Sequence, residues 1–307
     1  MKLYANLHSH TTHSDGIYTP TEIVRVAAKE GFHAFAVTDH DTVTGYEEAK
    51  AECDRLGLEC IFGCEFSAHY PERDVMLHVT AFNFDPNYPK MRKYLDERSF
   101  CETHKTKVCF ERGIADGLLS GVTWEEVLEF NKGITWLCNE HVFRLLKAKG
   151  LKCDLDYPEF FNKVYGKRRS EVKLPYEFLH VRDLIALVHE AGGIAIIAHP
   201  AKMYGSVDHL DEYIEMGIDG VEVWHSMLND DERQKALKVA LEKNLFVSGG
   251  EDHEGLCGGQ YARYEDPTVT RFYIPELSAG TTKDFFDEIK ANKLSSNRAE
   301  FFSELIK

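Results

Sequence analysis

The stretch NLHSHTTHSDG, residues 6–16, places three histidines and an aspartate within eight residues, directly after a short apolar run. In an extended segment alternate side chains share a face, so His8 and His10 can point at one metal ion. Imidazole nitrogens and carboxylate oxygens together suit Zn²⁺, Mn²⁺ or Fe²⁺. Asp15 is either a turn residue before a glycine or a carboxylate ligand to another ion of the same cluster. The stretch therefore predicts a metal site at the end of the first strand.

Histidines or acids lie at the carboxyl end of nearly every predicted strand. These residues are His8 and His10, Asp39 and His40, Glu65, His78, His199, Glu222 and His225, and Asp252 and His253. In an α/β barrel the carboxyl ends of the strands converge on one face, which carries the site. In a doubly wound sheet only the strand ends near a switch point do so. Ligands after six or more strands therefore favour a barrel.

The sequence around several of these residues indicates their roles. Glu65 follows a buried strand, where an acid is costly unless it is paired or metal-bound, and one carboxylate can bridge two cations. Asp39 is expected to orient an imidazole from behind. His78 and His199 lie in apolar runs, where a histidine is more often a core residue, although Pro200 would hold His199 at the rim.

The segment SGGEDHEG, residues 248–255, completes the set of candidate ligands. Gly249 and Gly250 permit close approach of the backbone, and Asp252 and His253 offer ligands beside them. Two or three clustered cations would lower the pKa of a bridging water and hold the oxygens of a phosphate. No serine or cysteine nucleophile with a paired base stands out. We therefore expect direct attack by metal-bound hydroxide, with Mn, Fe or Zn favoured over magnesium.

The elements that must position these residues alternate along the chain. Apolar runs predict strands at 2–7, 33–38, 59–63, 75–82, 194–199, 218–225, 245–252 and 269–274. Amphipathic runs predict helices at 19–31, 45–57, 181–193, 207–217, 230–244 and 282–292. A capping box of Thr19 and Glu22 opens the first helix. Strand–helix alternation of this kind predicts a parallel α/β fold.

The middle of the chain has a different pattern. From about 90 to 180 it is mostly helical and more charged, with helices predicted at 123–130 and 139–150 and no clear strand between them. We therefore expect a barrel domain formed by residues 1–89 and 181–307, and a helical insertion domain at 90–180.

Composition limits the classes of function. The chain has 307 residues, 43% of them hydrophobic, and a formal net charge of −15, which argues against a broad electrostatic grip on long nucleic acid. None of the eight cysteines forms a CxxC pair. No apolar leader and no run of membrane-spanning length is present. We expect a cytoplasmic protein with reduced thiols and no membrane partner.

The motifs HSHTTHSDG, TDHD, the glutamate of GCEFS, AHP and SGGED follow, in order and spacing, those of the PHP (polymerase and histidinol phosphatase) phosphoesterases. The chain resembles this family throughout, except in the helical middle. The resemblance implies a distorted (β/α)₇ barrel, similar to a TIM barrel, with two or three divalent metal ions. It implies three ligand sets: His8, His10, Glu65 and Asp252; Glu65, His78 and His199; and Asp15, His40 and a residue of the last motif.

Within the family, the helical middle and the stretches GGIAIIAHP and VEVWHS resemble a subgroup that acts on nucleotides. Members of that subgroup remove phosphate from nucleoside 3′,5′-bisphosphates or trim short RNA from its 5′ end. The resemblance implies that Glu65 and His225 are catalytic. It also implies that His225 and His141 contact the substrate.

The last motif departs from the family pattern, which usually reads Asp-x-His. A gapless match puts Asp252 and Glu254 in the two slots, whereas a shift by one residue puts Glu251 and His253 there. Asp252 is therefore expected as a ligand of the first ion, and His253 is a candidate ligand of the third.

The insertion also departs from the subgroup, which usually has an arginine two residues before the histidine. Asn139 stands in that slot. The residues that could compensate for the lost phosphate contact are Arg168, Arg169 and Lys173.

We therefore expect a metal-dependent phosphoesterase that acts on small nucleotides or short oligonucleotides. A metal-dependent amidohydrolase also opens with HxH on a barrel strand, but it typically bridges its metals with a lysine where this chain has Glu65. A histidinol-phosphate phosphatase is a further alternative, against which the large insertion counts. A non-enzymatic binding module with a decayed site is another alternative, against which the near-complete ligand set counts, apart from the third ion. The sequence determines neither the oligomeric state nor the native metal.

Overall fold

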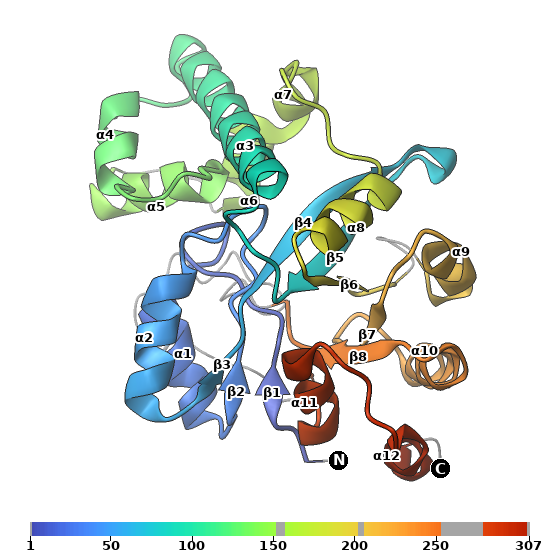
Figure 1. Ribbon diagram of the computed structural model, residues 1–307. Helices are drawn as coiled ribbons and strands as arrows, with labels where there is room; N and C mark the ends of the chain where they lie inside the picture. The colour runs from blue at the N-terminus through green and yellow to red at the C-terminus, as the bar shows by residue number, and fades with distance from the viewer. Residues whose placement is uncertain (1, 152–156, 202–205, 253–278, 306–307) are drawn as a thin grey trace.

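The strands of this computed structural model, which describes residues 2–151, 157–201, 206–252 and 279–305, form two sheets (Figure 1). The first sheet is parallel and contains, in order, β1 (Ala5–Asn6), β2 (Ala34–Phe35) and β3 (Glu59–Cys60). The second contains, in order, β4 (Gly63–Tyr70), β5 (Val75–Phe82), β6 (Ile194–Ile197), β7 (Gly220–Trp224) and β8 (Phe246–Gly249). The predicted strand at 269–274 lies outside the described residues.

Backbone contacts join the two sheets at both sides. Leu7 N, just after β1, donates to Gly249 O at the end of β8 (3.1 Å). Asp41 N, beyond β2, donates to Glu65 O in β4 (2.9 Å). The predicted α/β class with parallel strands is confirmed. The described strands form two sheets rather than one closed barrel, so the barrel remains a prediction.

Strands β4 and β5 correct the expected topology. The apolar run 59–63 predicted one strand, but β3 ends at Cys60 and the separate strand β4 begins at Gly63. β5 pairs antiparallel with both β4 and β6, whereas β6, β7 and β8 are parallel. For β4 and β5 the physical reason is the connection, because the turn Pro71–Arg73 is too short for the crossover that a parallel pair needs.

The helices that cover the strands begin and end close to their predicted positions. They are α1 (Pro20–Lys29), α2 (Tyr46–Leu56), α8 (Val181–Glu190), α9 (Leu210–Glu215), α10 (Asp230–Lys243) and α11 (Lys283–Ala291). The predicted capping box at α1 is present, with Glu22 N donating to Thr19 Oγ1 (3.2 Å) and Thr19 N to Glu22 Oε2 (3.0 Å). Helix α12 (Arg298–Leu305) was not predicted from the sequence.

The middle of the chain forms a separate group of helices at one end of the molecule, as Figure 1 shows. They are α3 (Pro89–Ala115), α4 (Trp124–Phe130), α5 (Asn139–Ala148), α6 (Tyr157–Phe160), a π-helical turn (Phe161–Tyr165) and α7 (Gly166–Glu171). These helices share a hydrophobic cluster of their own, to which Val127, Phe143 and Phe160 contribute fully buried side chains. We call this group the helical layer.

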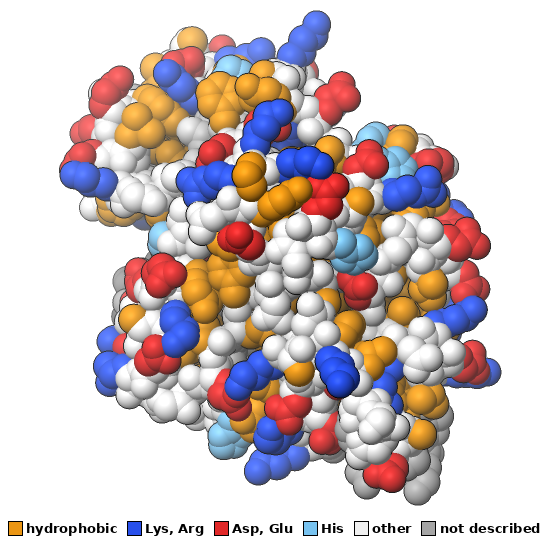
Figure 2. Space-filling view, in the orientation of Figure 1, with side chains coloured by type: hydrophobic (Ala, Val, Ile, Leu, Met, Phe, Trp, Pro, Cys, Tyr) orange, Lys and Arg blue, Asp and Glu red, His pale blue; other side chains and the backbone are white. Residues whose placement is uncertain are grey.

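The cysteines, the helices and the surface charges bear on the remaining predictions. The cysteines of the described part, at positions 53, 60, 64, 101, 109 and 138, are free. Within the described ranges, no helix combines the length and the apolar character that crossing a bilayer requires. On the face that Figure 2 shows, acidic and basic side chains are interspersed, so this face offers no continuous basic track for a long nucleic acid.

Candidate metal centre

The carboxylate of Glu65, in β4, lies among five imidazoles and is fully buried. Its Oε1 atom lies 3.2 Å from His8 Nε2, 3.2 Å from His78 Nδ1 and 3.0 Å from His199 Nε2. Its Oε2 atom lies 3.2 Å from His10 Nε2 and 3.1 Å from His40 Nδ1. Five histidines from distant parts of the sequence therefore surround one carboxylate.

Three groups of side chains could each hold a metal ion, because their ligand atoms lie within 4.8 Å of one another. They are His8, His10, Glu65 and Asp252; His10, Asp15 and His40; and His40, Glu65 and His78. The first group contains the same four residues as the first predicted ligand set. The group of Glu65 and His78 contains His40 where the prediction had His199. The group of Asp15 and His40 contains His10 where the prediction had a residue of the last motif.

The hydrogen bonding of the cluster tests whether these residues fit a metal. Within the described part of the chain, several buried atoms of the cluster, among them His8 Nε2, His10 Nε2, His40 Nδ1 and Glu65 Oε2, lack a hydrogen bond of good geometry. Buried polar atoms without such a partner are rare in folded proteins. Cations held by the candidate groups would give each of these atoms a partner, and the nitrogen and carboxylate donor set suits Zn²⁺, Mn²⁺ or Fe²⁺. The residues fit the predicted ions.

The charges of the cluster support one another. Burial alone would raise the pKa of Glu65, but the nearby His8, His78 and His40 imidazoles lower it well below its ordinary value. Burial alone would lower the pKa of His40, but the Asp15 carboxylate raises it to about 9. The buried acids therefore stay ionised, in the form that coordinates a metal, whereas His40 would have to release a proton to become a ligand.

Glu222, which belongs to β7, lies behind the ligands and supports two of the histidines. Its carboxylate oxygens lie 3.1 Å from His8 Nδ1, and its Oε2 accepts from the backbone N of His199 (2.8 Å). A carboxylate behind a ligating imidazole fixes the tautomer and the ring orientation. Glu222 was predicted to lie at a strand end, but no role for it was predicted from the sequence. The available signal was its position between two valines in a buried strand, where an unpaired acid would be costly.

Asp39 has a different role from the predicted one. Instead of orienting an imidazole, it accepts hydrogen bonds from Thr11 N (2.7 Å), Thr11 Oγ1 (2.8 Å) and Ser14 Oγ (2.6 Å). It therefore holds the loop that carries Asp15. Asp15 Oδ1 lies 3.5 Å from His10 Nδ1, and Asp15 Oδ2 lies 3.4 Å from His40 Nε2.

The last motif approaches the first strand closely. A Cβ atom on Gly250 would lie 2.4 Å from His8 N, so only glycine fits there, as the sequence predicted. Asp252 follows in the left-handed region, with φ of 51°, and its Oδ1 atom lies 3.0 Å from His10 Nε2. Such backbone conformations in non-glycine residues concentrate at functional sites. His253, the other candidate of this motif, lies outside the described residues.

His225 lies just beyond β7 and is buried beside the cluster. Its Nδ1 accepts from Met227 N (3.1 Å), so Nε2 carries the proton of the neutral ring. Nε2 lies 3.8 Å from Asp252 Oδ2 and makes no hydrogen bond to a described residue. Burial lowers the pKa of His225 and keeps the ring neutral. His225 can therefore donate one hydrogen bond toward the candidate metal centre.

His141, the predicted substrate contact of the helical layer, is fully buried. Its Nδ1 accepts from Cys138 N (3.0 Å) and its Nε2 donates to Thr12 O (3.0 Å). Burial lowers the pKa of His141 well below its ordinary value. Both ring nitrogens are thus engaged by the backbone, and this geometry argues against the predicted substrate contact.

A cleft of about 670 Å³ opens beside the metal candidates, between the strand ends and the helical layer. Its wall includes Asp15, His40 and His78 on one side and Trp136, Tyr157, Phe161, Lys105 and Arg169 on the other. Glu102, also in the wall, accepts from Lys105 Nζ (2.6 Å) and lies 2.7 Å from Arg169 Nη2. The cleft thus combines aromatic side chains with two positively charged side chains, Lys105 and Arg169, which share the carboxylate of Glu102.

Asn139 stands where the related subgroup usually has an arginine, and Arg169 brings a guanidinium group to this place. Its Nη1 donates to Asn139 Oδ1. Arg168 instead pairs with Asp116 (2.8 Å), away from the cleft, and Lys173 is exposed. Of the three residues that could compensate, Arg169 is the one that lines the cleft.

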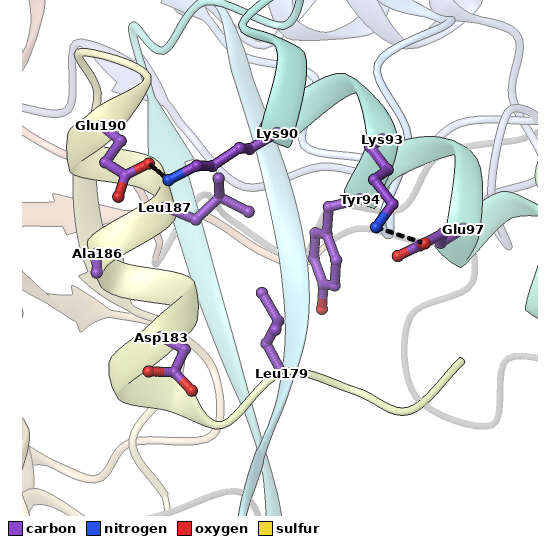
Figure 3. Close-up of a pocket in the computed structure, with 9 residues that line it drawn as sticks. All are labelled: Lys90, Lys93, Tyr94, Glu97, Leu179, Asp183, Ala186, Leu187 and Glu190. Carbon is purple, nitrogen blue, oxygen red and sulfur yellow. Dashed lines mark hydrogen bonds and ion pairs between the residues drawn. The ribbon is translucent and has the colours of Figure 1, made fainter.

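A second groove, of about 380 Å³, lies between α3 and α8 (Figure 3). Tyr94 and Leu187 line its apolar part, while Lys90 pairs with Glu190 (2.7 Å) at its rim. None of the candidate metal ligands lines this groove.

Comparison with known protein families identifies the domain that contains these residues. The profile of the PHP domain matches residues 6–222, which contain nearly all of the candidate ligands. The chain belongs to the PHP domain family. Asp252 lies beyond the matched PHP region, although its side chain contacts His10 within it.

Three curated relatives cover most of the chain. A Haemophilus influenzae protein named 5′-3′ exoribonuclease is 30% identical over 82% of this chain and 90% of its own length. An Eggerthella lenta phosphoribosyl 1,2-cyclic phosphate 1,2-diphosphodiesterase is 26% identical over 82% and 95%. A Chromobacterium violaceum 3′,5′-nucleoside bisphosphate phosphatase is 27% identical over 89% and 96%.

A solved structure agrees with the PHP assignment. A Bifidobacterium adolescentis chain assigned as a metal-dependent phosphoesterase superimposes with a TM-score of 0.72 at 27% identity, covering 96% of this chain and 98% of that one. These comparisons confirm the predicted family and the predicted class of enzyme, a hydrolase that acts on phosphate esters.

Proposed function

We propose that this chain is a metal-dependent phosphoesterase that releases phosphate from small nucleotides, such as nucleoside 3′,5′-bisphosphates, or trims the 5′ ends of short oligonucleotides. The observation that carries the proposal is the Glu65 carboxylate surrounded by five imidazoles, beside a cleft that contains cations and aromatic rings. A single carboxylate between two groups of ligands can bridge two cations, an arrangement that suits a two-metal hydrolase.

The proposed ligands form two or three sites for Mn, Fe or Zn. His8, His10, Glu65 and Asp252 would hold one ion, and the other ions would be held by Glu65, His78, His199, His40 and Asp15, with His253 a further candidate. When bound, such ions supply positive charge to phosphate oxygens and lower the pKa of a coordinated water.

The remaining chemistry belongs to side chains of the chain. His225 Nε2–H would donate to an oxygen of the scissile phosphate, because Met227 N already occupies Nδ1. The buried surroundings of His225 exclude water and strengthen such a hydrogen bond. We also propose a distorted (β/α)₇ barrel for residues 1–89 and 181–307, with residues 90–180 as the inserted domain.

The cleft supports the choice of substrate class. Lys105 and Arg169, which share the Glu102 carboxylate, leave one positive charge among these three side chains in the wall of the cleft, and this charge suits a second anionic group. Trp136 lies near His40, with ring centroids 6.0 Å apart, and offers a flat face to a base. Of the remaining alternatives, an amidohydrolase fits less well because Glu65 occupies the bridging position where that class has a lysine.

A phosphate-release screen with Mn²⁺ tests the proposal. It compares nucleoside 3′,5′-bisphosphates, mononucleotides, histidinol phosphate, a ribose cyclic phosphodiester and 5′-phosphorylated oligonucleotides. We expect the highest kcat/KM for a bisphosphate or a short oligonucleotide. A preference for histidinol phosphate would support that alternative instead, and no turnover of any phosphate ester would refute the proposal.

A further inference from the structure

Helix α5 contacts the loop 11–16 through three side chains. Each donates to a different backbone carbonyl: Arg144 Nη1 to Gly16 O (2.6 Å), His141 Nε2 to Thr12 O (3.0 Å) and Cys138 Sγ to Ser14 O (3.6 Å). The accepting residues alternate along the loop. The helical layer is therefore fastened directly to the segment that carries Asp15.

The hydrogen bond from His141 has a fixed direction. Cys138 N–H can only donate, so His141 Nδ1 must accept and Nε2 must carry the proton of the neutral ring. Nε2–H then points at Thr12 O, which can only accept. Because Cys138 and His141 also form the capping box of α5, the start of this helix and its contact with the loop are one structure.

The opposite side of the loop is held as well. Asp39 accepts from Thr11 and Ser14, as described above. A Cβ atom on Gly16 would lie 2.5 Å from the carbonyl carbon of His10, so the loop is folded tightly back on itself. Asp15 thus lies between a support on the strand side, from Asp39, and a support on the helical side, from α5.

We propose that α5 is a positioning element of the metal centre, in which Cys138, His141 and Arg144 hold the loop 11–16 so that Asp15 stays within reach of His10 and His40. This inference rests on the proposed function, since it requires that His10, Asp15 and His40 bind an ion. His141 is then a positioning residue rather than a substrate contact. Occupancy of one metal site thereby depends on the docking of the helical layer.

The test measures metal binding directly. Arg144→Met and His141→Phe remove one donor each and keep the bulk of the side chain, whereas His141→Gln retains an N–H near the position of Nε2. Bound Mn²⁺ is counted by mass spectrometry after equilibrium dialysis over a range of Mn²⁺ concentrations. We expect Arg144→Met and His141→Phe to bind the weakest ion about 10–100-fold less tightly, the range for partners behind metal ligands. His141→Gln should regain most of that affinity.

Lys149→Met is the matched control. Lys149 is the C-cap residue of α5, but it donates to Gly121 O (2.8 Å) and pairs with Glu126, both within the helical layer. We expect its Mn²⁺ binding to equal that of the wild type. The melting temperature of each variant without metal shows whether the fold is retained.

The outcomes separate this inference from the proposed function. If the wild type binds Mn²⁺ and Arg144→Met and His141→Phe bind it equally well, the positioning role is wrong and the metal centre stands. An equal loss in His141→Phe and His141→Gln would also overturn the role of the Nε2 donor. A wild type that binds no Mn²⁺ would overturn the metal centre and the positioning role together.

Discussion

Both carboxylate oxygens of Glu222 lie 3.1 Å from Nδ1 of His8, and both side chains are buried. A carboxylate only accepts hydrogen bonds, so Nδ1 carries a proton and Nε2 is the nitrogen that faces Glu65. The strand β7 therefore orients a candidate ligand that follows β1. This relationship links two segments 214 residues apart in the sequence.

Glu222→Gln should weaken metal binding while leaving the ligands in place. Glutamine keeps the size of the side chain but loses the charge that fixes the orientation of His8. We expect the affinity of the first site for Mn²⁺ to fall about 10–100-fold. Calorimetric titration of the metal-free chain measures it. Glu242→Gln, an exposed acid of α10, is the control. Equal affinities in the two variants would refute the supporting role of Glu222.

Glu65→Gln should have a larger effect, because this carboxylate lies in two of the three candidate groups. A bridging ligand serves two ions, so its loss should exceed the effect of an outer partner and lower phosphate release at least about 100-fold. Initial rates with saturating Mn²⁺ test this expectation. A variant that keeps wild-type activity would remove Glu65 from the site.

The strand-end ligands could be predicted because their signal is local. His8 and His10 are separated by one residue, and a strand puts such a pair on one face. Helix ends are equally local, and the capping box of Thr19 and Glu22 places the start of α1 correctly. Where chemistry and periodicity lie within a few residues, sequence is sufficient to place the elements and the ligands.

Features that depend on tertiary partners could not be predicted. The hydrogen bonds of Asp39 run to Thr11 and Ser14, and those of His141 to Thr12 and Cys138, so their roles depend on how the loop folds. The antiparallel pairing of β4 and β5 depends on a short turn rather than on hydrophobic periodicity, which both orientations share.

Arg169→Met should separate substrates by their second charge. Arg169 lines the cleft beside Asn139, so we expect it to contact an anionic group distant from the scissile phosphate. Losing a charge-assisted hydrogen bond costs about 1.5–3 kcal/mol. We therefore expect kcat/KM for a nucleoside 3′,5′-bisphosphate to fall about 10–100-fold, with a much smaller change for a mononucleotide.

Arg168→Met is the control for this experiment, because Arg168 is the neighbouring residue but pairs with Asp116 instead of lining the cleft. It should leave both substrates unaffected. An equal loss on mono- and bisphosphate in Arg169→Met would point to a general structural role and contradict the predicted contact.

The pair of His189 and Asp219 predicts a pH dependence of stability. Asp219 accepts from His189 Nε2 (2.7 Å), and this hydrogen bond raises the pKa of His189. A pKa raised by folding adds stability that is fully present below the unfolded value of about 6.5 and is lost as the pH rises through the folded pKa. The side chain of His189 is 40% exposed, so screening limits the contribution to less than about 1 kcal/mol.

Urea unfolding of the wild type and His189→Gln, in a series from about pH 5.5 upward, measures this contribution. The advantage of the wild type should be largest at the acidic end and should shrink as the pH rises. The imidazole titration of His189 by NMR should give a midpoint above about 6.5. An advantage that grows with pH would contradict the sign of the shift.

Removal of metal should destabilise the fold, because the candidate ligands come from β4, from β5 and from the loops after β1, β2, β6 and β8, and so connect most of the strands. An ion at about 100 times its Kd stabilises the folded state by about 2.7 kcal/mol per site, provided that it does not bind the unfolded chain. Dialysis against a chelator should therefore lower the melting temperature by several degrees, and Mn²⁺ or Zn²⁺ should restore it more effectively than Mg²⁺, whose preferred ligands are oxygens. Glu65→Gln is the matched comparison, since only the group of His10, Asp15 and His40 does without Glu65, so the melting temperature of this variant should change less with metal than that of the wild type. If chelation leaves the wild-type melting temperature unchanged and no ion is released, the candidate ligands do not bind metal in the folded protein.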